Sequence, residues 1–344
     1  MKKAAIIIVN WNGKKFLKNC LDAVFRQNYK NFHVYFVDNG SIDGSADYVK
    51  QNFPKTTIIQ LDKNYGFAKG SNEGIKEALK DKDIDYIVCL NNDTIVSKDW
   101  LKELVKTAER NPKIGMVSSK AYFLNKKIQN AGLILKKEIL SYKEGGVSLG
   151  YGKSDLEFKK LNNEIEIFAP GGVAPLYKRE MMLDLLKINH EFFDEDFFAY
   201  VEDWDVGFVG RLRGWRCLLS PKAKLIHLHS KSSGIGSAFK IFHSERNVIL
   251  TAIKNLPLGL LIQFIYYNVK AKINYITDQK KNKQRRRTKL SKMQILKIVL
   301  KAYMSSMILL PKMIIKRYNI QTKKKVSDDE IRIWFDTYGE ELKD

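Results

Sequence analysis

Short apolar segments alternate with longer amphipathic ones along residues 4–90. Residues 4–9 and 32–37 are apolar and rich in β-branched side chains, which is typical of buried strands. Residues 14–27 between them carry apolar side chains at helical spacing, at Phe16, Leu17, Cys20, Leu21, Val24 and Phe25. The same order then repeats, with a helix, a strand, a helix and a strand predicted at 44–52, 57–60, 69–80 and 86–90. This alternation predicts an α/β fold with a mostly parallel central sheet and helices on both faces.

Three polar clusters follow directly after predicted strands. They are Asn10-Trp11-Asn12, Asp38-Asn39-Gly40-Ser41 and Asn91-Asn92-Asp93. Ligands of parallel α/β sheets bind beyond the carboxyl ends of the strands, which is where these clusters lie. We therefore expect a ligand site along this edge of the sheet.

Two segments have the chemistry to bind a nucleotide. Asp38 can accept hydrogen bonds from a nucleobase imide or a ribose hydroxyl. Alternatively, it only forms a turn before a helix capped by Ser41 or Asp43. Residues 64–72 open a predicted helix with two glycines, and the N-terminus of a helix attracts a pyrophosphate. The alternative for this segment is a plain turn into a surface helix.

Two further motifs suit metal binding and proton transfer. The oxygens of Asn91-Asn92-Asp93 suit Mg²⁺ or Mn²⁺, unless these residues merely end a strand. His227 and His229 share one face of a predicted strand, as metal ligands or as structural residues. Segment 197–207 packs Glu202, Asp203 and Asp205 among aromatic residues, and burial raises a carboxylate pKa toward the range of a general base. Helix capping would account for one of these acids but hardly for all three.

The composition is that of a folded protein, with 44% apolar and 28% charged residues among 344. The net charge of +22 belongs mostly to a tail, because residues 269–325 hold eighteen Lys or Arg and the single acid Asp278. We predict a catalytic domain at 1–255, divided into a nucleotide-sugar half (1–115) and an acceptor half (116–255), followed by a basic helical region at 256–344. The scattered cysteines favour a reducing, cytoplasmic setting, and the first apolar segment is too short for a signal peptide.

The tail carries an apolar stripe at helical spacing. Its members are Met293, Leu296, Leu300, Tyr303, Met307, Leu310 and Ile314, and lysines lie elsewhere on the same helix. This pattern predicts a helix lying on an anionic membrane, with no segment reaching the roughly 20 apolar residues of a span. The alternatives are packing on the catalytic domain or on a second copy in a homodimer. The basic run at 280–287 also admits a nucleic-acid-binding protein, but confinement of the charge to a tail with aliphatic stripes argues against nucleic acid as a partner.

Five motifs in register resemble glycosyltransferase family 2, the inverting enzymes of GT-A fold, and especially its rhamnosyltransferase-like bacterial branch. The resemblance covers roughly residues 3–250. The motifs are Ile-Val-Asn-Trp-Asn at 8–12, Val-Asp-Asn-Gly-Ser at 37–41, Asn-Tyr-Gly-Phe-Ala at 64–68, Asn-Asn-Asp-Thr at 91–94 and the acidic aromatic stretch at 197–206 followed by Arg-Leu-Arg-Gly-Trp at 211–215.

This resemblance implies a role for each matching residue. Asp203 would be the base that deprotonates the acceptor hydroxyl, with Glu202 beside it, and Asp93 and His227 would hold Mg²⁺ or Mn²⁺. The nucleotide sugar would be bound by Asn10, Asn12, Asp38, Asn64, Gly66, Phe67, Asn72, Asn92 and Asp93. The acceptor side would include Gly171, Gly172 and Trp204.

The resemblance also implies an activity. It is the transfer of one sugar, rhamnose or another hexose, from a UDP- or dTDP-sugar to a hydroxyl of a cell-surface glycan or lipid-linked saccharide, at the inner face of the cytoplasmic membrane. The family usually has more than one Asp at the metal motif, whereas here Asn91 and Asn92 flank the single Asp93. This departure leaves open an inactive relative that only binds nucleotide sugar. Residues 210–215 lack the Gln-x-x-Arg-Trp of processive synthases, which favours single-sugar transfer.

Overall fold

The computed structural model describes residues 1–135, 147–228, 237–277 and 290–340. His229 and the basic run at 280–287, both noted in the sequence, lie outside the described residues.

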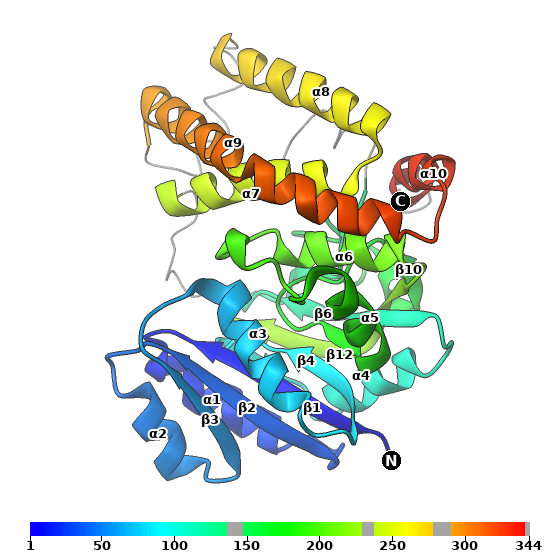
Figure 1. Ribbon diagram of the computed structural model, residues 1–344. Coiled ribbons are helices and arrows are strands. Elements are labelled where there is room, and N and C mark those ends of the chain that lie inside the picture. The colour runs from blue at the N-terminus through cyan, green and yellow to red at the C-terminus, as the bar shows by residue number, and fades with distance from the viewer. Residues whose placement is uncertain (136–146, 229–236, 278–289, 341–344) are drawn as a thin grey trace.

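A twisted sheet of ten strands forms the centre of the molecule, in the order β10-β12-β6-β11-β4-β1-β2-β3 with β5 and β7 added at β12 and β6 (Figure 1). Its strands are β1 (Lys3–Asn10), β2 (Phe32–Asn39), β3 (Thr56–Leu61), β4 (Ile84–Cys89), β5 (Thr94–Val96), β6 (Ile114–Tyr122), β7 (Ile128–Asn130), β10 (Ile165–Ile167), β11 (Leu176–Lys178) and β12 (Arg216–His227). A small second sheet pairs β8 (Leu133–Ile134) with β9 (Val147–Ser148). The strands predicted within residues 4–90 are all confirmed.

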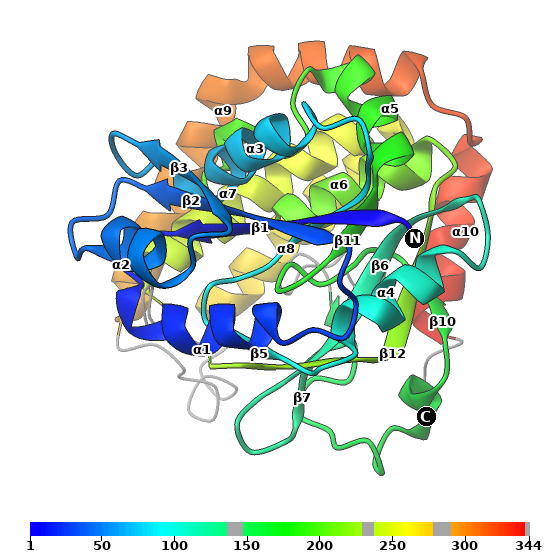
Figure 2. The same cartoon turned by 90° about the horizontal axis from the view of Figure 1, so that it is seen from below.

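Helices cover both faces of the sheet, as predicted (Figure 2). They are α1 (Lys14–Phe25), α2 (Ser45–Asn52), α3 (Gly66–Ala78), α4 (Trp100–Ala108), α5 (Arg179–Asn189) and α6 (Glu202–Leu212), with short 3₁₀ turns η2 (Lys159–Asn162) and η3 (Glu195–Phe197). In β1, Ile6 and Ile8 pack toward α1 and α4, whereas Ala5 and Ile7 pack toward α3. Both faces of the strand are therefore buried, which is why its sequence is apolar without alternation.

The strand order places the predicted polar clusters at one edge. Strand β1 pairs in parallel with β2 and β4, and Asn10 lies opposite Asp38. The central pairings are parallel, but β11 is antiparallel to both of its neighbours, β4 and β6. The chain entering β11 thus runs back over the end of β4, where the Asn91 N–H donates to the Val173 carbonyl at 3.0 Å. This bond brings the turn containing Gly171 and Gly172 next to the Asn91-Asn92-Asp93 cluster.

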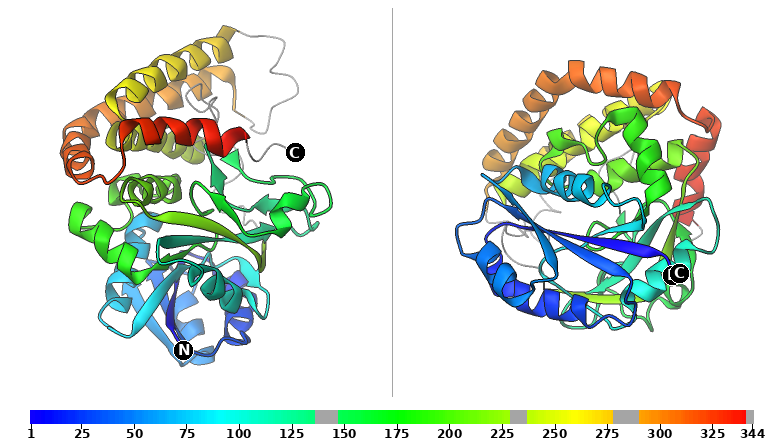
Figure 3. Two further views of the ribbon diagram at one scale, coloured as in Figure 1. Left: turned by 90° about the vertical axis from the view of Figure 1, so that its right-hand side faces the viewer. Right: turned by 60° about the horizontal axis from the view of Figure 1, so that its bottom comes forward.

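The C-terminal part consists of four helices, α7 (Ala238–Asn255), α8 (Leu258–Thr277), α9 (Lys292–Thr322) and α10 (Asp328–Glu340) (Figure 3). The long α9 begins with a capping box formed by Ser291 and Gln294 and packs along α7. Helix α10 reaches back to the catalytic part, where the Trp334 ring lies 6.1 Å from that of Phe168. The tail therefore packs on the sheet-containing part, and its predicted helix at 293–318 is confirmed.

Much of the apolar surface of α8 and α9 faces outward. Among the described residues, the exposed large apolar side chains on these helices are Leu258, Ile262, Ile265, Tyr266, Tyr267, Val269, Met293, Leu300, Met304, Met307, Ile308, Ile314, Ile315 and Tyr318. By length and composition, α9 is long and apolar enough to cross a membrane, contrary to our expectation that no segment would be. The reason is that residues 298–315 hold only two charged side chains, Lys301 and Lys312.

Candidate active site

The ends of β1 and β2 form one wall of the candidate site. Asp38 is 4% exposed, and its Oδ1 atom has no hydrogen-bond partner within the described part of the chain. A buried carboxylate oxygen without a donor is costly unless a ligand supplies one. An imide N–H of a nucleobase is such a donor, so the environment of Asp38 fits the role predicted for it.

Asparagine side chains hold this wall in place. The Asn92 amide donates to Asn10 Oδ1 at 2.6 Å, and the Asn10 amide donates to Ser41 Oγ at 3.2 Å. Asn12, with φ of 51°, accepts a hydrogen bond from the Ile42 N–H at 2.9 Å and donates its own N–H to Ser41. The structure thus brings Asn10, Asn12 and Asn92 together as expected, and their amides connect the ends of β1 and β4 to the turn after β2.

The start of α3 contacts the chain's own backbone, where we had expected a pyrophosphate. Gly66 has φ of 86°, and a Cβ atom there would lie 2.4 Å from the Phe198 carbonyl oxygen. That carbonyl also accepts the Ala68 N–H at 3.1 Å. Asn64 Oδ1 accepts from the Gly66 N–H at 2.9 Å and from Asn39 at 3.1 Å. The glycine is therefore needed so that the loop preceding α6 can approach α3.

Asn72 and Phe67 contact the same loop, and their role in binding the nucleotide sugar stays a prediction. Both ends of the Asn72 side-chain amide bond to the backbone of Phe193, at 2.8 and 3.0 Å. The ring of Phe67 lies 6.1 Å from the ring of Phe193. These contacts connect α3 to the segment before α6, the helix that begins with Glu202 and Asp203.

The metal candidates Asp93 and His227 meet although they are far apart in sequence. Strands β5 and β12 pair antiparallel with Thr94 opposite His227, which sets His227 Nε2 3.0 Å from Asp93 Oδ1. His227 Nδ1 lies 2.8 Å from Gln129 Oε1, an oxygen that can accept the ring proton. With the ring proton on Nδ1, the lone pair of His227 Nε2 and the Asp93 carboxylate could bind one cation together.

These two residues fit a divalent cation that is completed by other ligands. No group of three His, Cys, Asp or Glu able to hold a metal lies within the described ranges. However, Mg²⁺ takes one or two carboxylates plus substrate phosphates, and neighbouring ligands at about 2.1 Å from an octahedral ion are about 3.0 Å apart. Gln129 was not anticipated from the sequence, because nothing in its local pattern marks it as a partner of His227.

The predicted acid pair begins α6. The carboxylate of Asp203 accepts the backbone N–H groups of Gly172 and Trp204, both at 2.8 Å. Burial raises the pKa of Asp203 to about 6, against the opposing effect of these two N–H groups. Burial, followed by repulsion from Asp203, raises the pKa of Glu202 to about 8. Near neutral pH the pair therefore holds one proton, on Glu202, and Asp203 is an ionised carboxylate able to accept another.

The glycine turn admits Asp203 closely. A Cβ atom at Gly172 would lie 2.8 Å from Asp203 Oδ2, and one at Gly171 would lie 2.3 Å from Asn130 Oδ1. Trp204 is only 3% exposed, with its ring stacked 5.3 Å from that of Phe208. The place of Trp204 on the acceptor side stays a prediction. The third acid of the segment, Asp205, is ion-paired with Lys254 at 2.7 Å.

Comparison with known proteins gives a family match for part of this geometry. Residues 5–160 match the model of "Glycosyl transferase family 2". This segment is therefore similar to a family 2 glycosyltransferase domain. The strand-end residues from Asn10 to Asp93 lie within the matched range of this domain, and Glu202, Asp203 and His227 come from the chain that follows it.

Curated relatives of this family 2 domain include bacterial polysaccharide synthases. The chain is 27% identical over 220 residues to poly-beta-1,6-N-acetyl-D-glucosamine synthase of Staphylococcus aureus (strain COL), covering 63% of this chain and 48% of that protein. The synthase of the same name from Staphylococcus epidermidis is 24% identical over 218 residues, covering 61% and 49%. The chain thus spans about half the length of the curated relatives it matches.

Solved structures share the GT-A fold over nearly the whole chain. The structure of S. aureus TarS 1-349 matches with a TM-score of 0.51 and 16% identity, covering 96% of this chain and 91% of that one. The same protein in complex with UDP-GlcNAc matches with a TM-score of 0.53 and 16% identity, covering 96% and 92%. The predicted GT-A fold is confirmed.

Proposed function

We propose that this chain transfers a single sugar from a nucleotide-diphosphate sugar to a hydroxyl group of a saccharide or lipid-linked saccharide, with inversion at the anomeric carbon. The observation that supports this most is the position of Asp203. Its carboxylate bonds to Gly172, and the neighbouring Val173 bonds to Asn91 at the metal motif. A base is thereby held beside the residues suited to the donor's diphosphate, as direct displacement requires.

In this reaction Asp203 accepts the proton of the acceptor hydroxyl as its oxygen attacks the anomeric carbon. The bond from that carbon to the diphosphate breaks on the opposite side, so the configuration inverts and no covalent intermediate forms on the enzyme. Asp38 accepts the imide N–H of the base, and Asp93 with His227 would hold Mg²⁺ or Mn²⁺. When bound, such a cation neutralises the charge that develops on the departing diphosphate.

The donor is a UDP- or dTDP-sugar in this proposal, carrying rhamnose or another hexose. The curated relatives are named for N-acetylglucosamine and the similar TarS structure was solved with UDP-GlcNAc, so UDP-N-acetylglucosamine is the first donor to test. Single-sugar transfer is retained, because residues 210–215 lack the motif of processive synthases.

We further propose that the chain works on the inner face of the cytoplasmic membrane, with the outer face of α8 and α9 on the lipid. Apolar side chains on this face, such as Ile308 (77% exposed) and Ile315 (64% exposed), lie on a helix that also exposes Lys297, Lys301 and Lys312. An apolar surface bordered by cations suits an anionic bilayer, and a lipid-linked acceptor would be within reach there. A homodimer through the same face is the competing explanation.

The decisive experiment screens UDP-, dTDP- and GDP-sugars for turnover and follows the anomeric configuration of the product by NMR. We expect one donor class to react with inversion. Asp203→Asn should then lower turnover by about a hundredfold or more while the nucleoside diphosphate still binds. Retention of configuration, or unchanged turnover in Asp203→Asn, would contradict the mechanism.

A second candidate is a relative that binds nucleotide sugar without transferring it. The single carboxylate among Asn91, Asn92 and Asp93 favours it, since fewer charges hold a divalent cation more weakly. In the same screen, tight binding without turnover for every donor would support this candidate.

A further inference from the structure

The loop between α5 and α6 carries unusual backbone conformations directly before the acid pair. Phe198, Tyr200 and Val201 have φ of 63°, 70° and 75°, although none of them is glycine. Positive φ is unfavourable at such residues and persists only where the surroundings enforce it. The direction in which α6 presents Glu202 and Asp203 therefore depends on whatever holds this loop.

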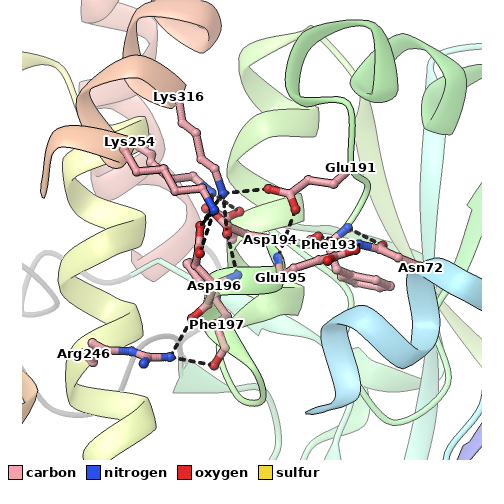
Figure 4. Close-up of polar contacts among 12 residues, drawn as sticks. Asn72, Glu191, Phe193, Asp194, Glu195, Asp196, Phe197, Arg246, Lys254 and Lys316 are labelled. Atoms are coloured by element: carbon pink, nitrogen blue, oxygen red, sulfur yellow. Dashed lines mark hydrogen bonds and ion pairs between the residues drawn. The ribbon is translucent and has the colours of Figure 1, made fainter. Parts of the chain in front are cut away.

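Helix α7 holds the loop through side chains that bond to its carbonyls. The Asn247 amide, fully buried, lies within hydrogen-bonding distance of the carbonyl oxygens of Phe197 (3.0 Å), Ala199 (2.9 Å) and Tyr200 (2.8 Å). Arg246 adds bonds to the carbonyls of Asp196 and Phe197, at 2.7 and 2.9 Å (Figure 4). One short stretch of α7 thus bonds to four carbonyls of the loop, those of Asp196, Phe197, Ala199 and Tyr200.

Helix α9 reaches the same loop with a single buried cation. Lys316 Nζ lies 2.6 Å from Glu191 Oε1, 2.6 Å from Asp194 Oδ1 and 2.8 Å from Asp196 Oδ2. Lys254 of α7 completes the cluster by pairing with Asp194 at 2.5 Å (Figure 4). It also pairs with Asp205 of α6 at 2.7 Å. Burial alone would raise the pKa of Asp194, but the two lysines hold it below its usual value.

The opposite side of this loop rests on the nucleotide-sugar half. The Phe198 carbonyl accepts a hydrogen bond from the Ala68 N–H of α3. The side-chain amide of Asn72, also on α3, forms hydrogen bonds with the backbone of Phe193. The loop is consequently held between two parts of the molecule, with α3 on one side and α7 and α9 on the other.

We propose that Asn247 and Lys316 are positioning residues for Asp203, which makes α7 and α9 part of the transferase machinery. This inference rests on the proposed function. In the described part of the chain, neither side chain forms a hydrogen bond or ion pair with Asp203, so each acts through the loop. Removing either one should let Phe198–Val201 relax toward negative φ and move Asp203 away from Gly172.

The test compares loop-contacting variants with a matched variant that holds the same helices together elsewhere. Arg317 of α9 donates to the carbonyls of Ile253 (2.7 Å) and Leu256 (2.6 Å). Among the described residues it forms no hydrogen bond or ion pair with the loop. We therefore compare Asn247→Ala and Lys316→Met with Arg317→Ala, and use Lys316→Arg for rescue. Turnover is measured with the donor that the wild type uses fastest, nucleoside diphosphate binding by calorimetry, and folding by thermal melting.

We expect kcat to fall about tenfold or more in Asn247→Ala and Lys316→Met, because small displacements of a reacting group are costly, while the Kd of the nucleoside diphosphate stays within about threefold. Lys316→Arg should recover most of the activity, and Arg317→Ala should keep it even where its melting temperature falls. Wild-type kcat in folded Asn247→Ala, or an equal loss in Arg317→Ala, overturns the inference. If Lys316→Met does not fold, the kcat values of the two single variants Asn247→Ala and Lys316→Arg decide whether the inference holds. A wild type without turnover for any donor overturns the proposed function itself.

Discussion

At the scale of single residues, the acid pair at the start of α6 shows how burial divides two neighbouring carboxylates. Asp203 has two backbone N–H donors, whereas Glu202 Oε2 is buried and has no hydrogen-bond partner in the described structure. The donors favour the charged form of Asp203, whereas burial and the charge of Asp203 favour the neutral form of Glu202. One residue can thus act as a base while its neighbour stays protonated.

We predict that Glu202→Gln stabilises the protein increasingly as the pH rises. The pKa of Glu202 is about 8 in the folded state and about 4.3 when unfolded, so between these values only the folded state holds the proton and wild-type stability falls with rising pH. Gln has no proton to lose. The difference in melting temperature, variant minus wild type, should therefore grow from pH 5 to pH 8. A constant difference would show that Glu202 is ionised in the folded protein.

The pairing of Asp93 with His227 leads to a prediction about metal binding. In wild type, Mn²⁺ should tighten UDP binding measured by calorimetry, and Asp93→Ala should abolish that effect. Gln129→Ala should weaken Mn²⁺ binding by about 10–100-fold, since it orients the histidine ring. Asp83→Ala, which removes an exposed carboxylate elsewhere, serves as the control. Equal UDP binding with and without Mn²⁺ in the wild type would refute a metal site here.

At the scale of elements, the sequence predicted those helices and strands whose signals are local. Residues 4–90 could be assigned because apolar periodicity reports directly on burial. The antiparallel insertion of β11 was not predicted, because a strand of three residues has too little periodicity. Lys316 read as a surface lysine on a basic helix, and only the fold brings Glu191, Asp194 and Asp196 around it. Asn247 had no signal either, since its partners are backbone carbonyls.

The outward face of α9 gives a prediction about lipid binding. Ile308→Glu with Ile315→Glu should lower binding to vesicles containing phosphatidylglycerol by about tenfold or more, because charge replaces apolar area at the lipid surface. Stability should change little, since both side chains are largely exposed. Leu156→Glu, at a site 83% exposed in the catalytic part, is the matched control. If vesicle binding is unchanged and sedimentation instead shows loss of a dimer, the face is a protein interface.

At the scale of the whole molecule, the boundary predicted at residue 255 separates two parts that pack extensively. Lys312 and Lys316 of α9 pair with acids of the loop before α6, and Trp334 of α10 packs near Phe168. That residues 1–255 and 256–344 are separate domains stays a prediction from the sequence. The buried ion pairs argue for mutual dependence, because a buried carboxylate that loses its partner costs about 3–5 kcal/mol.

A chain that ends at residue 290 should therefore be markedly less stable than the full chain. It would keep Lys254 but lose Lys312 and Lys316, the two lysines of α9 that pair with the loop. Glu191 and Asp196 would then lack these partners. We expect its urea midpoint to fall, or the protein to aggregate through the uncovered face of α7. An unchanged midpoint would show that residues 1–290 form an independent unit.

The position of Lys316 also limits how α9 can meet a bilayer. The helix has the length and composition of a membrane span, yet its inner face carries the cation that neutralises three acids of the loop before α6. Threading α9 through a bilayer would withdraw that cation and leave the loop without its support. Helix α9 cannot both cross a membrane and supply Lys316 to this loop, so we predict that any contact of α9 with lipid is made along its outer face.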